Sequence, residues 1–163
     1  MLTEAGSKKR ASIHVPHGRE DLQLHDRGGL DVFECKLAEF QERLQKKNRT
    51  LKKSLTVPHL FDGIGDAYSD EILHAAQLSP VQWTTRLTEE HAKTLFENAQ
   101  LVLTTWTDRL RADTGEKFPE KVTAFHKQMA VHGKYGKPCP VCGVPVQRIV
   151  SAERQFNYCP DQV

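Results

Sequence analysis

The chain has 163 residues, of which 38% are apolar and 27% are charged, and its formal net charge is +2. This length suits one ordinary domain or two small modules, and the composition is that of a moderately polar, soluble protein. No apolar run is as long as a membrane span and no signal-peptide pattern opens the chain, which argues against a membrane or secreted protein. The four cysteines favour metal binding in a reducing compartment, so we expect a cytoplasmic protein.

The first stretch of the chain, residues 1–15, has a pattern that predicts a β-hairpin. Ala11, Ile13 and Val15 alternate with polar residues, which is the pattern of a half-buried strand. Two strands alone are marginally stable in water, so this stretch is expected to be the remnant of a larger sheet. Residues 16–30 are rich in Gly, Asp and His and predict a loop.

Two short helices are expected next, over residues 37–47 and 48–55, because apolar side chains recur there at helical spacing. The polar faces of these helices are expected to carry a basic cluster. On a nearly neutral chain, such a cluster indicates either a contact with a polyanion or an ordinary solvated helix face. The cluster consists of Arg43, Lys46, Lys47, Arg49, Lys52 and Lys53.

A tight turn containing Gly63 and Gly65 leads into a predicted helix over residues 67–76, with Asp66 as its N-cap. Free N–H groups at a helix N-terminus, beside glycines that allow close approach, form an anion-binding geometry. The alternative is a turn with no ligand. The basic helices that precede the turn favour a phosphate contact.

The longest predicted helix covers residues 89–112, with Thr88 as its N-cap. Glutamates at its start and arginines at its end match the helix dipole. Its apolar stripe recurs with a period of 3.6, and we expect this stripe to pack in the core. The stripe contains Ala92, Leu95, Phe96, Ala99, Val102, Leu103, Trp106 and Leu110.

The C-terminal stretch, residues 131–163, has the pattern of a zinc ribbon. Cys139 and Cys142 form a C-P-V-C knuckle, Cys159 opens a second half-knuckle, and the segment between them alternates like a β-hairpin. Cysteines spaced in this way supply thiolates from tight turns, so we expect one bound Zn²⁺.

A fourth cysteine is missing from this pattern, because Gln162 stands where a second C-x-x-C would end. Water, Asp161 or the terminal carboxylate of Val163 is expected to fill the fourth position. Isolated Cys35 is expected to be a small buried residue.

Four segments of this chain resemble the C-terminal part of bacterial formamidopyrimidine-DNA glycosylase. They are N-R-T-L-K at residues 48–52, L-F-D-G-I-G-D-A-Y-S-D-E-I-L at 60–73, F-P-E-K-V-T-A-F at 118–125, and V-H-G-K-Y-G-K-P-C-P-V-C-G-V-P-V at 131–146. The resemblance implies a mainly α fold, a helix–two-turn–helix (H2TH) bundle followed by a β-hairpin zinc finger. It also implies a role in base-excision repair of oxidised purines.

The resemblance divides the chain into four parts. They are a remnant of an N-terminal β-sandwich and linker (1–30), the H2TH domain (31–115), a loop region that closes over an extruded base (116–136) and the zinc finger (137–163). In that family an N-terminal proline is the nucleophile for glycosylase and abasic-site lyase chemistry. Met1-Leu2-Thr3 does not provide it, so we expect this chain alone to be inactive.

The resemblance also suggests which residues grip DNA. Arg154 matches an arginine that holds the phosphate at the flipped nucleotide and assists the final elimination. Lys47, Asn48 and Lys52 match positions near the lesion and its phosphates. The phosphate-binding turn corresponds to Gly63, Gly65 and Asp66, although the family usually has asparagine at the last of these positions.

Three functions remain open from the sequence. The chain is the DNA-binding half of a glycosylase, a damaged-DNA-binding module without chemistry, or an inactive fragment. The expected partner is double-stranded damaged DNA, with no membrane contact. We expect a monomer, whose missing half a separate polypeptide could supply.

Overall fold

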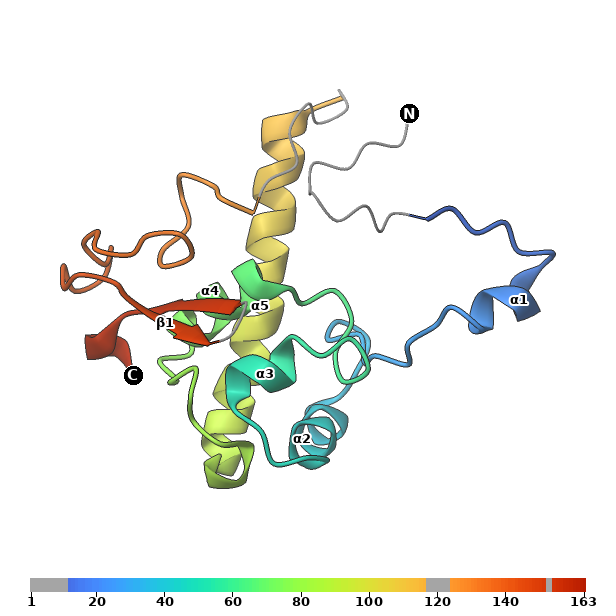
Figure 1. Ribbon diagram of the computed structural model, residues 1–163, viewed down its shortest axis with the longest axis horizontal. Helices are drawn as coiled ribbons and strands as arrows, with labels where there is room; N and C mark the ends of the chain where they lie inside the picture. The colour runs from blue at the N-terminus through green and yellow to red at the C-terminus, as the bar shows by residue number, and fades with distance from the viewer. Residues whose placement is uncertain (1–11, 117–123, 152–153) are drawn as a thin grey trace.

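The computed structural model describes residues 12–116, 124–151 and 154–163. Figure 1 shows the long helix α5 running through the middle, with the C-terminal hairpin on one side and α1 standing away on the other. The elements are α1 (Arg19–Gln23), α2 (Leu37–Gln45), α3 (Leu51–Leu55), α4 (Asp66–Ala75), the 3₁₀ turn η1 (Thr84–Arg86), α5 (Glu89–Thr114), β1 (Gln147–Ser151), β2 (Arg154–Tyr158) and the 3₁₀ turn η2 (Pro160–Gln162).

Helix α5 forms where the sequence predicts it. The Thr88 side chain accepts a hydrogen bond of 3.1 Å from the backbone N–H of His91, which satisfies one of the free donors at the helix start. Gly115 ends the helix with a φ of 58°, a left-handed conformation that glycine adopts without strain. The expected helix therefore matches the observed one to within two residues.

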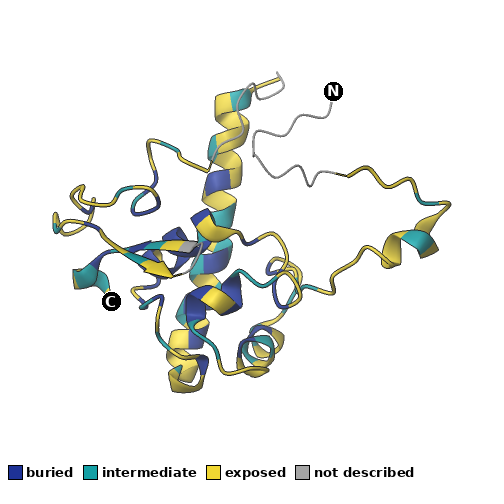
Figure 2. Cartoon of the chain, viewed as in Figure 1, coloured by how far each residue is buried: buried dark blue, intermediate teal, exposed yellow. Residues whose placement is uncertain are grey.

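The main core lies where α2, α3 and α4 pack against α5, as the buried colouring in Figure 2 shows. Phe40 of α2 is fully buried, and its ring lies 4.8 Å from that of Phe61 and 5.1 Å from that of Phe96. The stripe of α5 contributes Leu95 and Ala99 to the same core. Because all four helices bury apolar side chains together, the expected H2TH bundle is confirmed.

Two of the expected helix starts are wrong. Residues 48–50 are not helical, because Thr50 forms an isolated antiparallel bridge with Trp83 and the N–H of Leu51 donates to the Gln82 carbonyl. The N-cap of α4 is Gly65 rather than Asp66, and Asp66 is the first helical residue. Asp66 therefore makes no side-chain cap, although its charge still suits the helix N-terminus.

The expected N-terminal hairpin is not confirmed. Residues 12–15 form no strand and pair with no described segment, and Ile13 and Val15 are 74% and 85% exposed. Residues 1–11 of this prediction lie outside the described part. Within the predicted loop, α1 forms a short helix with no buried residue.

The C-terminal segment folds as the expected hairpin. Strands β1 and β2 are antiparallel, with a register that runs from Gln147 opposite Tyr158 to Ser151 opposite Arg154. Its core is small and contains Val131, Cys139, Val146 and Cys159. We call residues 137–163 the finger from here on. Among the described helices, none combines the length and hydrophobicity that crossing a membrane requires.

Candidate nucleic-acid interface and metal centre

The three finger cysteines come together as the sequence predicts. The Sγ atoms of Cys139, Cys142 and Cys159 all lie within 4.8 Å of one another, and none of the three forms a disulfide. In a tetrahedral site with Zn–S bonds of about 2.3 Å, the sulfurs lie roughly 3.8 Å apart. The Cys142–Cys159 separation of 3.3 Å is close to this value. The three thiols therefore fit zinc, which their soft donor atoms also favour.

The surroundings of the thiols shift the pKa values of Cys139 and Cys159 in opposite directions. Burial works to raise the pKa of Cys139, but hydrogen bonds from the backbone N–H groups of Cys142 and Val141, from His74 and from Cys159 lower it to about 6. Burial, followed by the neighbouring thiols, raises the pKa of Cys159 to about 11. The lowered pKa makes Cys139 the more readily deprotonated of the two thiols, whereas zinc binding at Cys159 must displace a proton.

The described residues supply no fourth His, Cys, Asp or Glu ligand that lies within 4.8 Å of all three sulfurs. Asp161, one of the groups expected there, is exposed and lies outside this cluster. The Gln162 side chain is turned to the helical domain, where its Oε1 accepts a hydrogen bond of 2.9 Å from Gln77 Nε2. Among the His, Cys, Asp and Glu side chains of the described residues, the three thiols are therefore the zinc ligands that the fold brings together.

Helix α4 holds the segment that leads into the finger through Glu71. Its buried carboxylate accepts hydrogen bonds from three successive backbone N–H groups, those of Ala130 (2.7 Å), Val131 (2.9 Å) and His132 (2.9 Å). These N–H groups would otherwise be buried without partners. The sequence does not reveal this contact, because the partners lie about sixty residues apart in the chain.

Asp70, the residue before Glu71, binds the finger itself. Its Oδ2 accepts from the backbone N–H of Asn157 on β2 (3.2 Å), from the Asn157 side chain (3.3 Å) and from His132 Nδ1 (2.8 Å). A buried carboxylate that satisfies donors on both strand and loop fixes their orientation. The hairpin therefore has a defined position on the helical domain.

Lys52 does not lie on the surface, contrary to the sequence prediction. It is fully buried, and its ammonium donates to Asp70 Oδ1 at 2.6 Å, to Ser69 Oγ at 2.8 Å and to the Asp66 carbonyl. The burial of this ammonium argues against the predicted direct contact with DNA, because its hydrogen bonds go to groups inside the helical domain. Its contact with the Asp66 carbonyl instead supports the first turn of α4.

The turn before α4 has the backbone that the glycines predict. Gly63 has a φ of 74°, and its N–H donates to Asp62 Oδ1 at 2.9 Å. A Cβ added at Gly65 would meet nothing within 4 Å, so the space beside this N-cap is open to a ligand from outside. Asp66 is exposed at the helix start.

The basic cluster is only partly available for a ligand. Lys46, Lys47 and Lys53 are exposed, whereas Arg43 donates to the carbonyls of Gly28 and His59. Asn48 is also exposed, and its Oδ1 accepts a hydrogen bond of 3.1 Å from the Thr85 hydroxyl.

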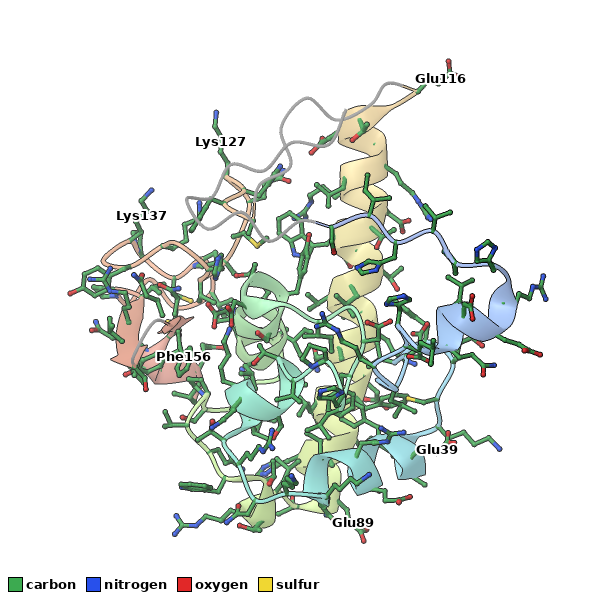
Figure 3. All side chains as sticks on the ribbon, turned by 45° about the vertical axis from the view of Figure 1, so that its right-hand side comes forward. Glu39, Glu89, Glu116, Lys127, Lys137 and Phe156 are labelled. Atoms are coloured by element: carbon green, nitrogen blue, oxygen red, sulfur yellow. The ribbon has the colours of Figure 1, made fainter. Side chains whose placement is uncertain are left out.

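The remaining predicted residues lie on the finger side. Arg154 begins β2 opposite Ser151, and its side chain lies outside the described part. Residues 117–123 of the predicted loop region also lie outside it. On the same side of the molecule, Lys127 and Lys137 point away from the helical domain (Figure 3).

Two family models match the chain. The formamidopyrimidine-DNA glycosylase H2TH domain matches residues 31–112, and the zinc finger found in FPG and IleRS matches residues 136–161. An uncharacterised formamidopyrimidine-DNA glycosylase-like protein of Mycobacterium tuberculosis is 32% identical over 132 residues, which cover 81% of this chain and 82% of that relative. The formamidopyrimidine-DNA glycosylase of Thermus thermophilus is 36% identical over 125 residues, which cover 74% of this chain but 47% of that protein.

The solved structures agree with these relatives. The crystal structure of MutM (Fpg) from Thermus thermophilus has a TM-score of 0.70 and 32% identity, and the match covers 88% of this chain and 56% of that one. A Lactococcus lactis FPG mutant in complex with Fapy-dG-containing DNA has a TM-score of 0.67 and 25% identity, covering 86% and 53%. The chain spans about half the length of these proteins. It therefore belongs to the formamidopyrimidine-DNA glycosylase family of DNA glycosylases, of which it carries the H2TH domain and the zinc finger.

Proposed function

We propose that this chain binds damaged double-stranded DNA, as the DNA-binding half of a base-excision repair glycosylase. The observation that carries the proposal is the docking on α4 of the finger, through Asp70, and of the segment that leads into it, through Glu71, which joins two modules of a glycosylase family into one body. A relative from Lactococcus lactis was crystallised with Fapy-dG-containing DNA. The proposed contacts are Lys47, Asn48, Arg154 and the turn from Gly63 to Asp66.

Electrostatics supports this assignment of the helical side. Lys47 is exposed and forms no salt bridge with the described residues, so its charge can meet a phosphate. The Gly65 N-cap adds the positive end of the α4 dipole. Each phosphate that a protein cation neutralises releases counterions, so binding of this kind must weaken as salt rises.

We further propose that these 163 residues bind DNA without excising a base or cleaving an abasic site. Lyase chemistry needs an amine that attacks the sugar, and the candidate substitute is Lys52, which the resemblance places near the lesion. Because Lys52 is buried and ion-paired with Asp70, its amine cannot reach a sugar. Borohydride trapping on abasic DNA is expected to give no covalent adduct, and an adduct would contradict this part of the proposal.

The binding proposal is tested by fluorescence anisotropy with a duplex that contains an abasic-site analogue, at salt concentrations between about 50 and 200 mM. The plot of log affinity against log salt is expected to have a negative slope. Lys47→Ala should reduce the magnitude of that slope by about 0.9, the contribution of one phosphate contact. The control is Lys93→Ala, which removes an exposed charge from α5 and should leave the slope unchanged.

Two results would count against the proposed function. Absence of binding at the lowest salt would favour the inactive-fragment alternative. Equal affinity for damaged and undamaged duplexes would contradict the proposal that the chain recognises damage.

We propose that the chain is a monomer, which analytical ultracentrifugation would measure. Excision activity is proposed to require a β-sandwich half from a separate polypeptide, tested by adding that half and measuring release of the damaged base from the duplex.

A further inference from the structure

One buried histidine joins the helical domain to the metal centre. His74 lies in the last turn of α4 and is 8% exposed, and its Nε2 is 3.3 Å from Cys139 Sγ. The two residues are 65 positions apart in the chain. Figure 1 shows why they meet, since α4 lies directly behind the hairpin. A polar ring buried at this place needs a partner, and the Cys139 sulfur is the partner that the described residues give it.

The geometry distinguishes two roles for this ring. A fourth zinc ligand would lie about 3.6 Å from each of the three sulfurs, given Zn–S bonds of about 2.3 Å and Zn–N bonds of about 2.0–2.1 Å. His74 Nε2 is close to Cys139 but is not within 4.8 Å of all three sulfurs, since the cluster that meets this limit contains the cysteines alone. The ring is therefore placed beside one sulfur, as a hydrogen-bond donor is.

We propose that His74 is a positioning residue of the zinc site, whose Nε2–H donates a hydrogen bond to the Cys139 thiolate. Three thiolates around Zn²⁺ leave a net charge of −1, and a donor to one sulfur disperses part of it. The bond also fixes the Cys139 side chain from outside the finger. The metal site then extends across two domains, and α4 carries residues for both the finger's backbone and its metal.

This assignment has particular weight in a site with three protein ligands. A fourth thiolate would be a further strong ligand, whereas here the described residues bring three thiols together. Groups that orient metal ligands commonly contribute a factor of 10–100 in metal affinity. We therefore expect His74 to decide how well this finger retains zinc.

The test is zinc affinity of the whole chain without DNA, measured by competition with a chromophoric chelator. His74→Phe keeps a ring of similar size but removes the donor, and it should lower zinc affinity about 10–100-fold. His74→Gln restores an N–H donor and should recover most of the loss. His91→Phe, at an exposed histidine on α5, is the matched control and should have no effect. Unchanged affinity in His74→Phe, or no recovery in His74→Gln, would overturn the proposal.

Two further readouts separate a donor from a ligand. The d–d absorption of the cobalt-substituted protein should keep its position in His74→Gln, because the set of metal ligands is the same. In the unmutated, zinc-loaded chain, nitrogen-15 spectra should show Nε2 protonated. A band shift in the variant, or an unprotonated metal-bound Nε2, would mean that His74 itself binds the metal. None of these measurements involves DNA, so their outcome is independent of the proposed function.

Discussion

At the scale of single residues, two adjacent lysines have opposite environments. Lys53 is exposed on α3, whereas Lys52 is fully buried and ion-paired with Asp70 of α4. Both belong to the same basic cluster in the sequence. A charge is buried in a protein only with a partner, and the partner of Lys52 lies eighteen positions further on. Charge patterning along one helix could not reveal that pair.

Loss of Lys52 should therefore appear as loss of stability rather than as loss of a DNA contact. Lys52→Met leaves Asp70 buried without its cation and should lower the free energy of unfolding by about 3–5 kcal/mol. Lys53→Met is the control next in sequence, and it should change stability by less than about 0.5 kcal/mol. Urea denaturation measures both. Similar stabilities for the two variants would contradict a buried ion pair.

Asp66 offers a second residue-scale prediction, which concerns DNA. Its exposed carboxylate stands at the N-terminus of α4, where it would repel a phosphate at about 4 Å by roughly 1–4 kcal/mol. Asp66→Asn removes that repulsion and supplies an amide donor, so affinity for an abasic duplex at low salt should rise. Glu97→Gln removes an equal charge from an exposed site on α5 and serves as the control. Equal affinities of Asp66→Asn and the unmutated chain would refute this role for Asp66.

At the scale of the elements, the sequence predicted several locally encoded features correctly, although not the N-cap of α4, and it missed the contacts between distant segments. Neighbouring residues alone determine three features that were predicted correctly: the helical period of α5, its cap at Thr88 and the C-P-V-C knuckle. The start of α3 was not, because the bridge between Thr50 and Trp83 depends on segments 33 positions apart. The sequence also did not reveal the contacts that α4 makes with the finger and the segment before it, because these partners are distant in the chain as well. The residues of α4 are Asp70, Glu71 and His74.

The apolar stripe of α5 gives a test at this scale. Trp106 is 5% exposed and packs with Ala67 and Met129, so α5 also supports the segment that leads into the finger. Trp106→Ala should lower the free energy of unfolding by about 3–5 kcal/mol. Leu101 is 62% exposed on the same helix, and Leu101→Ala should lower the free energy of unfolding by less than about 0.5 kcal/mol. A loss below about 1 kcal/mol for Trp106→Ala would mean that the stripe does not pack as described.

At the scale of the whole molecule, the two modules differ in what holds them. The helical domain has an extended apolar core, whereas the buried cluster of the finger contains two valines and two cysteines. So small a core cannot order a hairpin without metal, and binding of structural zinc is folding free energy for such modules. Helix α4 joins the modules, with the candidate phosphate-binding turn at its N-terminus and His74 at its last turn.

Removal of zinc should therefore disorder the finger and weaken DNA binding about as much as Arg154→Ala does, because both changes would remove the phosphate contact that we propose for the hairpin. Gln162→Cys completes a C-x-x-C knuckle beside Cys159. Structural zinc in four-ligand fingers is worth about 10–16 kcal/mol, so one added thiolate should raise zinc affinity well beyond tenfold and raise DNA affinity with it. Gln147→Cys adds a thiol at an exposed site on β1 and should do neither. Metal analysis and anisotropy measure the two quantities on the same samples. If the purified chain holds no zinc and Arg154→Ala still weakens DNA binding, the link from metal to hairpin to phosphate is wrong.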